Sequence, residues 1–227
     1  MLSRFLRPRT IWWPTWLGWL VLLVGAALPA GVWALKGERF LAVNAPLEAE
    51  ILIVEGWIGL DGMAEVRREF HRGGYAYIVT AGGPTGHRWT RSKFNYAVSA
   101  ADVLVGWGLP ASQVIAAPDD GRAEQRTFGA AMAVRAKLAE LGLKPKAVNV
   151  LSLGPHTRRS RLVYAKVLGD AIDVGSVAWW PEHYDREPWW RSSERGADFL
   201  KESVGYALEL FFSSGRWLKS ADAAAPR

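Results

Sequence analysis

The residues of this chain that are best suited to hold a charged ligand follow an apolar stretch in its second half. Residues 147–153 form that stretch, and behind it come His156, Arg158, Arg159 and Arg161. In α/β proteins, ligands bind at the carboxyl ends of parallel strands, where the first N–H groups of the following helix also point. The pattern therefore predicts an anion-binding site at this strand end.

Arg159 is the best candidate to hold the anion, because a guanidinium group can bind a phosphate or carboxylate through two parallel hydrogen bonds. Arg158 and Arg161 could instead face solvent. His156 either contacts the ligand or only caps and packs the start of the helix. Since the like charges of Arg158 and Arg159 lower the pKa of a nearby imidazole, we expect a neutral His156 ring that acts as a base or a donor.

Three other strand ends carry groups that could complete this site. Glu55 ends the first apolar run, and the pair Gly82 and Gly83 ends the second. Paired glycines permit positive φ and let backbone N–H groups come close to a ligand, although they could equally form only a tight turn. Asp119 follows the third run, where it is either an acid or base of the reaction or a solvated turn residue.

These residues need a scaffold, and short apolar runs alternate with helical patterns between residues 48 and 213. We expect strands at 51–54, 75–80, 113–117, 148–153 and 172–178, and helices at 61–72, 92–106, 122–141, 157–168 and 194–213. Such alternation requires crossover connections between parallel strands. The sequence predicts an α/β fold, namely a three-layer, Rossmann-like domain with a mainly parallel sheet of about five strands.

One transmembrane helix is predicted ahead of this domain, at residues 11–35. This run has no charged residue, and its 25 residues at about 1.5 Å each span roughly 37 Å, enough for a hydrocarbon core of about 30 Å. A cleaved signal peptide is the alternative, with Val32-Trp33-Ala34 as its cleavage site. The length of the run favours the uncleaved anchor.

The charges around the apolar run predict its orientation. Arg4, Arg7 and Arg9 precede it without an opposing acid, so the amino terminus is expected in the cytoplasm and the main domain outside, on the periplasmic side of the plasma (inner) membrane if the source is a bacterium. We expect residues 1–10 to be cytoplasmic, 36–47 to be a linker, 48–219 to form one extracytoplasmic domain, and 220–227 to be a disordered tail.

Composition narrows the range of functions. The formal net charge is +6, and three of these charges are the arginines before the apolar run, which leaves +3 for the rest. Such a small excess of positive charge does not indicate a nucleic-acid-binding protein. The chain has no cysteine, and His71 and His183 have no partners nearby in sequence, so we predict no metal site.

An aromatic loop, residues 179–191, separates the last two expected elements. It contains Trp179, Trp180, Trp189 and Trp190. The loop could pack under the final helix, rim the ligand pocket, or touch the membrane surface, where tryptophan is favoured.

Four motifs occur in a defined order along the chain. They are the glycine pair Gly82-Gly83, the stretch G-L-P-A-S-Q-V-I at 108–115, Thr127 within a helix, and Ser-x-x-x-His-x-x-Arg at 152–159. In this order and spacing the chain resembles the ElyC/SanA/YdcF family of bacterial envelope proteins. The resemblance extends over residues 51–212.

The resemblance implies a Rossmann-like fold behind a membrane anchor, and a role in envelope biogenesis that involves peptidoglycan or lipid-carrier metabolism. It also implies a set of ligand-binding residues, which are Gly82, Gly83, Thr127, His156 and Arg159. The chain departs from the family's pattern after the glycine pair, where it has His87, Arg88 and Arg91 in place of an acid.

Two functions of different classes agree with these patterns. The first is an enzyme that acts on a phosphorylated or otherwise anionic envelope precursor, such as a lipid-linked phosphate. In it, Glu55 or Asp119 is the acid or base beside His156. Arg159 and the glycine pair hold the anion. The second is a non-catalytic envelope factor that binds such a ligand or a partner protein.

One feature of the site would separate these two functions: an enzyme needs at least one carboxylate near His156, and a binding module does not. A nucleotide or S-adenosylmethionine enzyme is a weaker third alternative. The G-x-G-x-x-G fingerprint is not present after the first strand, and no acid ends the second strand to hold ribose hydroxyls.

Overall fold

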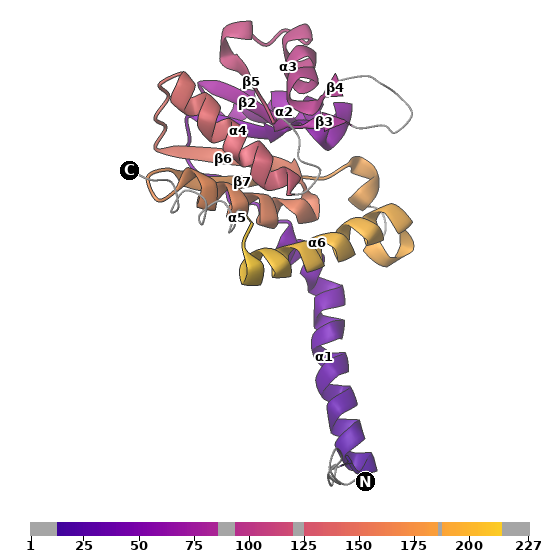
Figure 1. Ribbon diagram of the computed structural model, residues 1–227. Helices are drawn as coiled ribbons and strands as arrows, with labels where there is room; N and C mark the ends of the chain where they lie inside the picture. The colour runs from indigo at the N-terminus through magenta and orange to yellow at the C-terminus, as the bar shows by residue number, and fades with distance from the viewer. Residues whose placement is uncertain (1–12, 86–93, 120–124, 186–187, 215–227) are drawn as a thin grey trace, which may run out of the picture. The chain divides into compact units, whose positions relative to one another are not determined.

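The main domain is built on a five-stranded parallel sheet between two layers of helices (Figure 1). The computed structural model describes residues 13–85, 94–119, 125–185 and 188–214. The strands are β1 (Ile51–Glu55), β2 (Tyr77–Gly82), β5 (Val114–Pro118), β6 (Ala147–Leu153) and β7 (Asp173–Trp179), in the order β5-β2-β1-β6-β7. The predicted α/β, Rossmann-like architecture is confirmed.

Five helices follow the strands at the predicted places. They are α2 (Gly59–Gly73), α3 (Tyr96–Gly106), α4 (Arg126–Glu140), α5 (Thr157–Leu168) and α6 (Ser193–Phe212). Helix α3 begins later than expected, because the Asn95 side chain caps it by accepting a hydrogen bond of 2.9 Å from the Ala97 N–H. The residues before this cap form a short antiparallel pair, β3 (Pro84–Thr85) with β4 (Phe94–Asn95), which the sequence did not indicate.

Both faces of the sheet are covered, so its strands are mostly apolar on both faces rather than alternating between apolar and polar residues. In β1, Ile51 and Ile53 face the layer made by α4 and α5, whereas Leu52 and Val54 face α2 and α3. All four side chains are buried. Glu55, the only charged residue of β1, is buried too, so its charge needs partners inside the domain.

Along the chain, strands are added first on one side of β1 and then on the other, so the strand order reverses between β1 and β6. From β1 the chain adds β2 and β5 on one side, then returns to place β6 and β7 on the other. Ligands of open α/β sheets bind in the crevice at the carboxyl ends of the strands where this reversal occurs. Glu55, at the end of β1, and the segment that follows Leu153 of β6 lie on either side of this point.

Two glycines at the strand ends make room for the start of α3. A Cβ atom built on Gly82 would lie 2.8 Å from the Tyr96 Cβ, and one on Gly56 would lie 2.8 Å from the Tyr96 carbonyl carbon. Gly83 contributes its carbonyl oxygen, which accepts a 3.0 Å hydrogen bond from the Tyr96 N–H. Gly82 and Gly83 therefore pack in a turn against the start of α3.

Replacing Gly56 by Ala is expected to lower the free energy of unfolding by about 1–3 kcal/mol, because α3 has to move away from the new methyl group. Chemical denaturation of the full-length chain in detergent, followed by circular dichroism, measures this change. Gly106→Ala is the matched control, since nothing lies within 4 Å of its Cβ position. Equal losses at both positions would contradict the packing explanation.

Helix α1 (Trp16–Leu41) is long and apolar enough, by length and composition, to cross a membrane. It has 26 residues and a mean hydropathy of 1.9 over its most apolar window. The helix begins at Trp16, inside the predicted span 11–35, and ends at Leu41, beyond that span. Ile11, Trp12 and residues 1–10 fall outside the described part of the chain, as do residues 220–227.

The chain divides into two compact units, residues 1–37 and 38–227. The second unit already includes the last turn of α1, where Leu41 is fully buried. Further on, Ala45 pairs with Ser176 of β7 through two backbone hydrogen bonds of 2.9 and 3.1 Å. The segment 36–47, predicted as a linker, is thus held to the domain over much of its length, because its apolar and backbone groups complete the edge of the sheet.

Candidate functional site

Four charged side chains meet where β1 and β6 end, at the reversal of the strand order. We call them the ion-paired cluster, and they are Glu55, His156, Arg159 and Glu202. Glu55 ends β1, His156 ends the short 3-10 turn η4 (Gly154–His156), and the other two come from α5 and α6. The sequence predicted the first three of these residues at one site, and the structure brings them together.

Glu55 is buried and fully engaged. The Ser152 hydroxyl donates to one of its carboxylate oxygens, and the Ser160 hydroxyl donates to the other at 2.8 Å. Burial raises the pKa of this carboxyl, but the charge of His156 and the hydrogen bonds from His156, Ser152 and Ser160 outweigh burial and leave the pKa below its ordinary value. Glu55 is therefore ionised at neutral pH.

His156 lies between two carboxylates. Its Nδ1 is 2.9 Å from a Glu202 oxygen, and its Nε2 is 3.4 Å from a Glu55 oxygen. Burial lowers the pKa of the imidazole, yet the charge of Glu55 and the hydrogen bond to Glu202 raise it to about 9. The expected lowering of this pKa was wrong: although the Arg159 Nη2 also lies 2.9 Å from the His156 Nδ1, the two carboxylates on either side of the ring outweigh it.

The two ring nitrogens of His156 are held to different degrees. The Nδ1 contact with Glu202 has the length of a good hydrogen bond, whereas the Nε2 contact with Glu55 is longer than the usual 2.7–3.2 Å. The edge of the ring also meets the Trp57 ring, with centroids 5.1 Å apart. The Nε2–H group is consequently the less constrained donor of this protonated ring.

Arg159 is paired with an acid from the last helix. Its Nε and Nη2 atoms donate to the two Glu202 oxygens at 2.7 and 3.0 Å, a bidentate arrangement. A Cβ atom on Gly205 would lie 3.1 Å from the Arg159 Nε, so a glycine there lets α6 come close. Two guanidinium nitrogens are thus already occupied, and a bound anion must use the third or compete with Glu202.

The third guanidinium nitrogen of Arg159 points to α4. Its Nη1 donates to the Thr127 hydroxyl at 3.3 Å, which places Thr127 beside the cluster as the resemblance implies. Thr127 lies in the first turn of α4, and the positive end of a helix dipole attracts anions. The Arg159 side chain retains 19% of its exposure, the largest of the four cluster residues.

Asp119 lies near the cluster but does not join it. No hydrogen bond connects its carboxylate to the cluster within the described segments, and a Cβ on Gly129 of α4 would lie 2.9 Å from its carboxyl carbon. The negative charge of Asp119 acts on Tyr164: burial raises the pKa of this phenol most, followed by the charges of Glu55 and Asp119. Of the two acids that the sequence proposed, Glu55 is therefore the partner of His156.

The other two arginines of the motif have structural contacts and are not simply solvated. Arg158 donates to the Phe40 carbonyl at 2.5 Å and lies over the Phe40 ring, with its Cζ 3.9 Å from the centroid. Arg161 donates to the Val174 carbonyl of β7 at 2.8 Å. His87, Arg88 and Arg91 are outside the described residues.

Glu202 is the member of the cluster that sequence reasoning missed. It comes from α6, far along the chain, and no local motif connects it to His156. A signal was present, however, since Glu202 and Glu209 lie on one face of a helix whose other face is apolar, and both are buried. Acids on the inner face of a helix predict cations beneath them.

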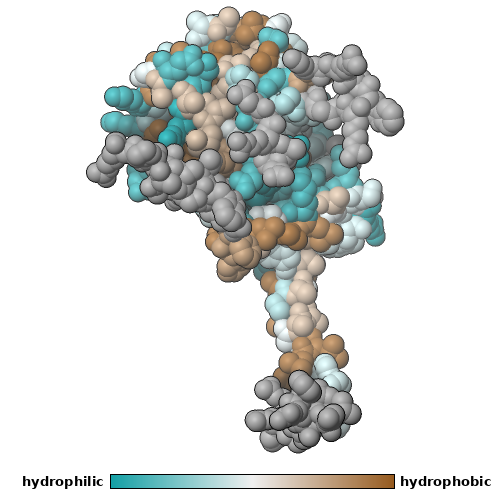
Figure 2. Space-filling view, viewed as in Figure 1, coloured by the Kyte–Doolittle hydropathy of each residue, from teal (hydrophilic) through white to brown (hydrophobic). Residues whose placement is uncertain are grey.

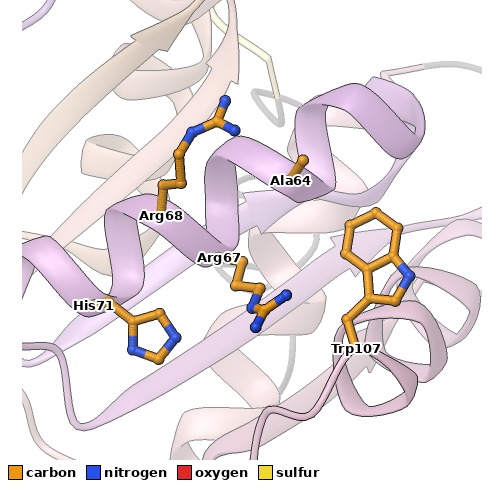
Figure 3. A pocket seen from close by; sticks show the side chains of 5 residues that line it. All are labelled: Ala64, Arg67, Arg68, His71 and Trp107. Atoms are coloured by element: carbon orange, nitrogen blue, oxygen red, sulfur yellow. The ribbon is translucent and has the colours of Figure 1, made fainter.

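A separate hollow of about 430 Å³ lies between α2 and α3, away from the cluster (Figure 3). It is lined by Ala64, Arg67, Arg68, His71 and Trp107. None of the residues predicted for the site contributes to it. Within the described part of the chain, no group of three or more His, Asp or Glu side chains could hold a metal ion.

Neither models of known protein families nor curated proteins match this chain. We therefore infer its function from the geometry of the ion-paired cluster and from the order of the motifs along the sequence.

Proposed function

We propose that the protein is a membrane-anchored envelope-biogenesis protein that binds and processes an anionic or phosphorylated cell-envelope precursor at the carboxyl edge of its sheet. The observation that carries this proposal is the position of the His156 imidazole between the Glu55 and Glu202 carboxylates at the reversal of the strand order. An enzyme requires at least one carboxylate near His156 and a binding module does not, and this site has two.

The cluster suits a proton donor better than a base. With a pKa of about 9, His156 carries its proton at neutral pH. Glu202 holds the Nδ1 side, so the Nε2–H, whose contact with Glu55 is longer, is the donor left for a ligand oxygen. When water attacks the phosphorus of a phosphate ester, this proton would pass to the leaving oxygen and assist the breaking of the ester bond. Before the transfer, Glu55 stabilises the charged imidazolium.

The anion would bind beside this donor. Arg159 Nη1 and the Thr127 hydroxyl are 3.3 Å apart at the start of α4, so a phosphate that contacts both from the solvent side meets a cation and the positive end of a helix dipole. The guanidinium of Arg159 then serves as the anion clamp through its third nitrogen, and Glu202 fixes its orientation.

The anchor and the cellular location are part of the same proposal. Helix α1 supports a single membrane span, and the arginines at positions 4, 7 and 9 favour a cytoplasmic amino terminus. The main domain would then face the periplasmic side of the plasma (inner) membrane, where lipid-linked envelope precursors occur. The motif order that resembles the ElyC/SanA/YdcF family supports this role.

A non-catalytic envelope factor is the second candidate, and one observation favours it. All four cluster residues have partners within the cluster, so the group can act simply as a tie between α6 and the sheet. A binding module would tolerate the loss of the proton donor, provided that the domain still folds.

Complementation separates the two candidates. In a bacterial strain that lacks this protein and has an envelope defect, His156→Gln is expected to abolish rescue while the membrane-inserted protein remains detectable. Glu55→Gln should reduce rescue as well, because it leaves the imidazole without its counter-charge. Immunoblots of membrane fractions measure the abundance of each variant.

Lys144→Ala provides the control for a lost surface cation. This residue is exposed in the connection before β6, at the edge of the sheet opposite the cluster, so its loss should be neutral. Full rescue by both His156→Gln and Glu55→Gln, at normal abundance, would refute catalysis and favour the binding factor.

A further inference from the structure

Helix α6 buries two acids besides Phe199 and exposes a row of large apolar side chains, unlike a helix that covers a core in water. Its inner face presents acids: Glu202 binds Arg159, and the Glu209 carboxylate accepts a hydrogen bond from the Lys166 ammonium. Both acids are buried. A surface helix of a water-soluble domain normally buries its apolar side chains and exposes the charged ones.

The outer face of α6 is apolar. Large exposed side chains recur along it at helical spacing: Leu200, Val204, Leu208 and Phe211. At 3.6 residues per turn these four lie within about 80° of the helix circumference, opposite Glu202 and Glu209. Val204 is 61% exposed and Phe211 is 81% exposed. Figure 2 shows this hydrophobic band over α6. We call these four residues the outer face of α6.

Residues at the end of α1, just beyond its apolar run, contact α6. Glu38 follows Leu35, the end of that run, by three residues, which is about 5 Å of helical rise. Its carboxylate accepts hydrogen bonds of 2.5 and 2.7 Å from Arg195 in the first turn of α6. Two residues further, the Phe40 ring meets the Tyr206 ring with centroids 5.9 Å apart.

We propose that the outer face of α6 lies in the interfacial region of the bilayer and contacts lipid acyl chains. Covalent continuity keeps α6 close to the membrane, and its apolar residues gain from leaving water there. Trp190, exposed just before α6, has the side chain that this region favours. The inference rests on the anchoring proposed above, and it adds a second membrane contact, which would hold the site edge near a lipid-linked ligand.

The chain has no cysteine, which allows a test by single labels in the full-length protein. Val204→Cys would carry an environment-sensitive fluorophore in vesicles of phosphatidylethanolamine and phosphatidylglycerol that contain doxyl-labelled lipid. We expect the label to lose about half of its fluorescence to the lipid quencher, as expected for a helix buried at the interface. Leu141→Cys is the control, because Leu141 is a similarly exposed apolar residue at the end of α4. Its label should be unaffected.

A second label distinguishes failure of this inference from failure of the anchor. Gly25→Cys lies in the middle of α1, where nothing lies within 4 Å of the Cβ position. A quenched label at position 25 with an unquenched one at position 204 would overturn the lipid contact. If the Val204→Cys chains then cross-link to each other, the outer face is an interface between two copies. An unquenched label at position 25 would overturn the anchoring itself, and the lipid contact with it.

Discussion

Replacing Glu202 by Gln is expected to lower the free energy of unfolding by about 3–5 kcal/mol, the usual cost of removing one partner from a buried ion pair. The amide keeps the shape of the side chain but leaves Arg159 and His156 with only Glu55 to balance two positive charges. Chemical denaturation of the full-length protein in detergent, followed by circular dichroism, measures the loss.

Glu140→Gln is the matched control for this substitution. Glu140 also forms an ion pair, with the Lys137 ammonium at 2.7 Å, but its side chain is 63% exposed. Exposed pairs contribute little, so the change should stay within about 0.5 kcal/mol. A similar small loss for Glu202→Gln would mean that the cluster is hydrated and not a buried ionic group.

The stability of the domain is expected to fall as the pH rises from about 6.5 to 9. Because the folded pKa of His156 is raised from 6.5 to about 9, its stabilising contribution is complete below pH 6.5 and disappears as the pH passes 9. A rise of this size corresponds to roughly 3 kcal/mol. The carboxyl pKa of Glu55 is lowered, so its own contribution is lost at the acidic end, as the pH falls below about 4.5.

Thermal unfolding of the full-length protein at a series of pH values measures this dependence. His156→Gln should be less stable than the parent protein at pH 6 and should lose the decline between pH 6.5 and 9. The decline would persist in His156→Gln if another group caused it. Such persistence would remove His156 as the source of the pH dependence.

The sheet and its helices could be predicted because hydrophobic period and turn residues determine them locally. The run at 51–54 is apolar on both faces and the run at 148–153 is mostly so, as buried parallel strands are. The start of α3 was misplaced, since the cap at Asn95 is a single side-chain contact within a helical pattern. The segment 36–47 was predicted only as a linker, because its pairing with β7 depends on residues far along the chain.

The site could be predicted in part. The carboxyl ends of parallel strands bring Glu55 and His156 together in any fold of this order, which is why both were identified. The charge state of His156 could not be predicted, because it depends on Glu202, and a contact between α5 and α6 leaves no local pattern. Arg159 was assigned to an anion without its partner for the same reason.

Nuclear magnetic resonance of the imidazole nitrogens tests the central claim most directly, namely that His156 is a protonated donor between two carboxylates. The chain has 4 histidines, and comparison with His156→Gln assigns the signal in the full-length protein. We expect the His156 ring to remain protonated until the pH reaches about 9. A midpoint at or below the ordinary value of 6.5 would contradict the ion-paired cluster and the proton transfer proposed for it.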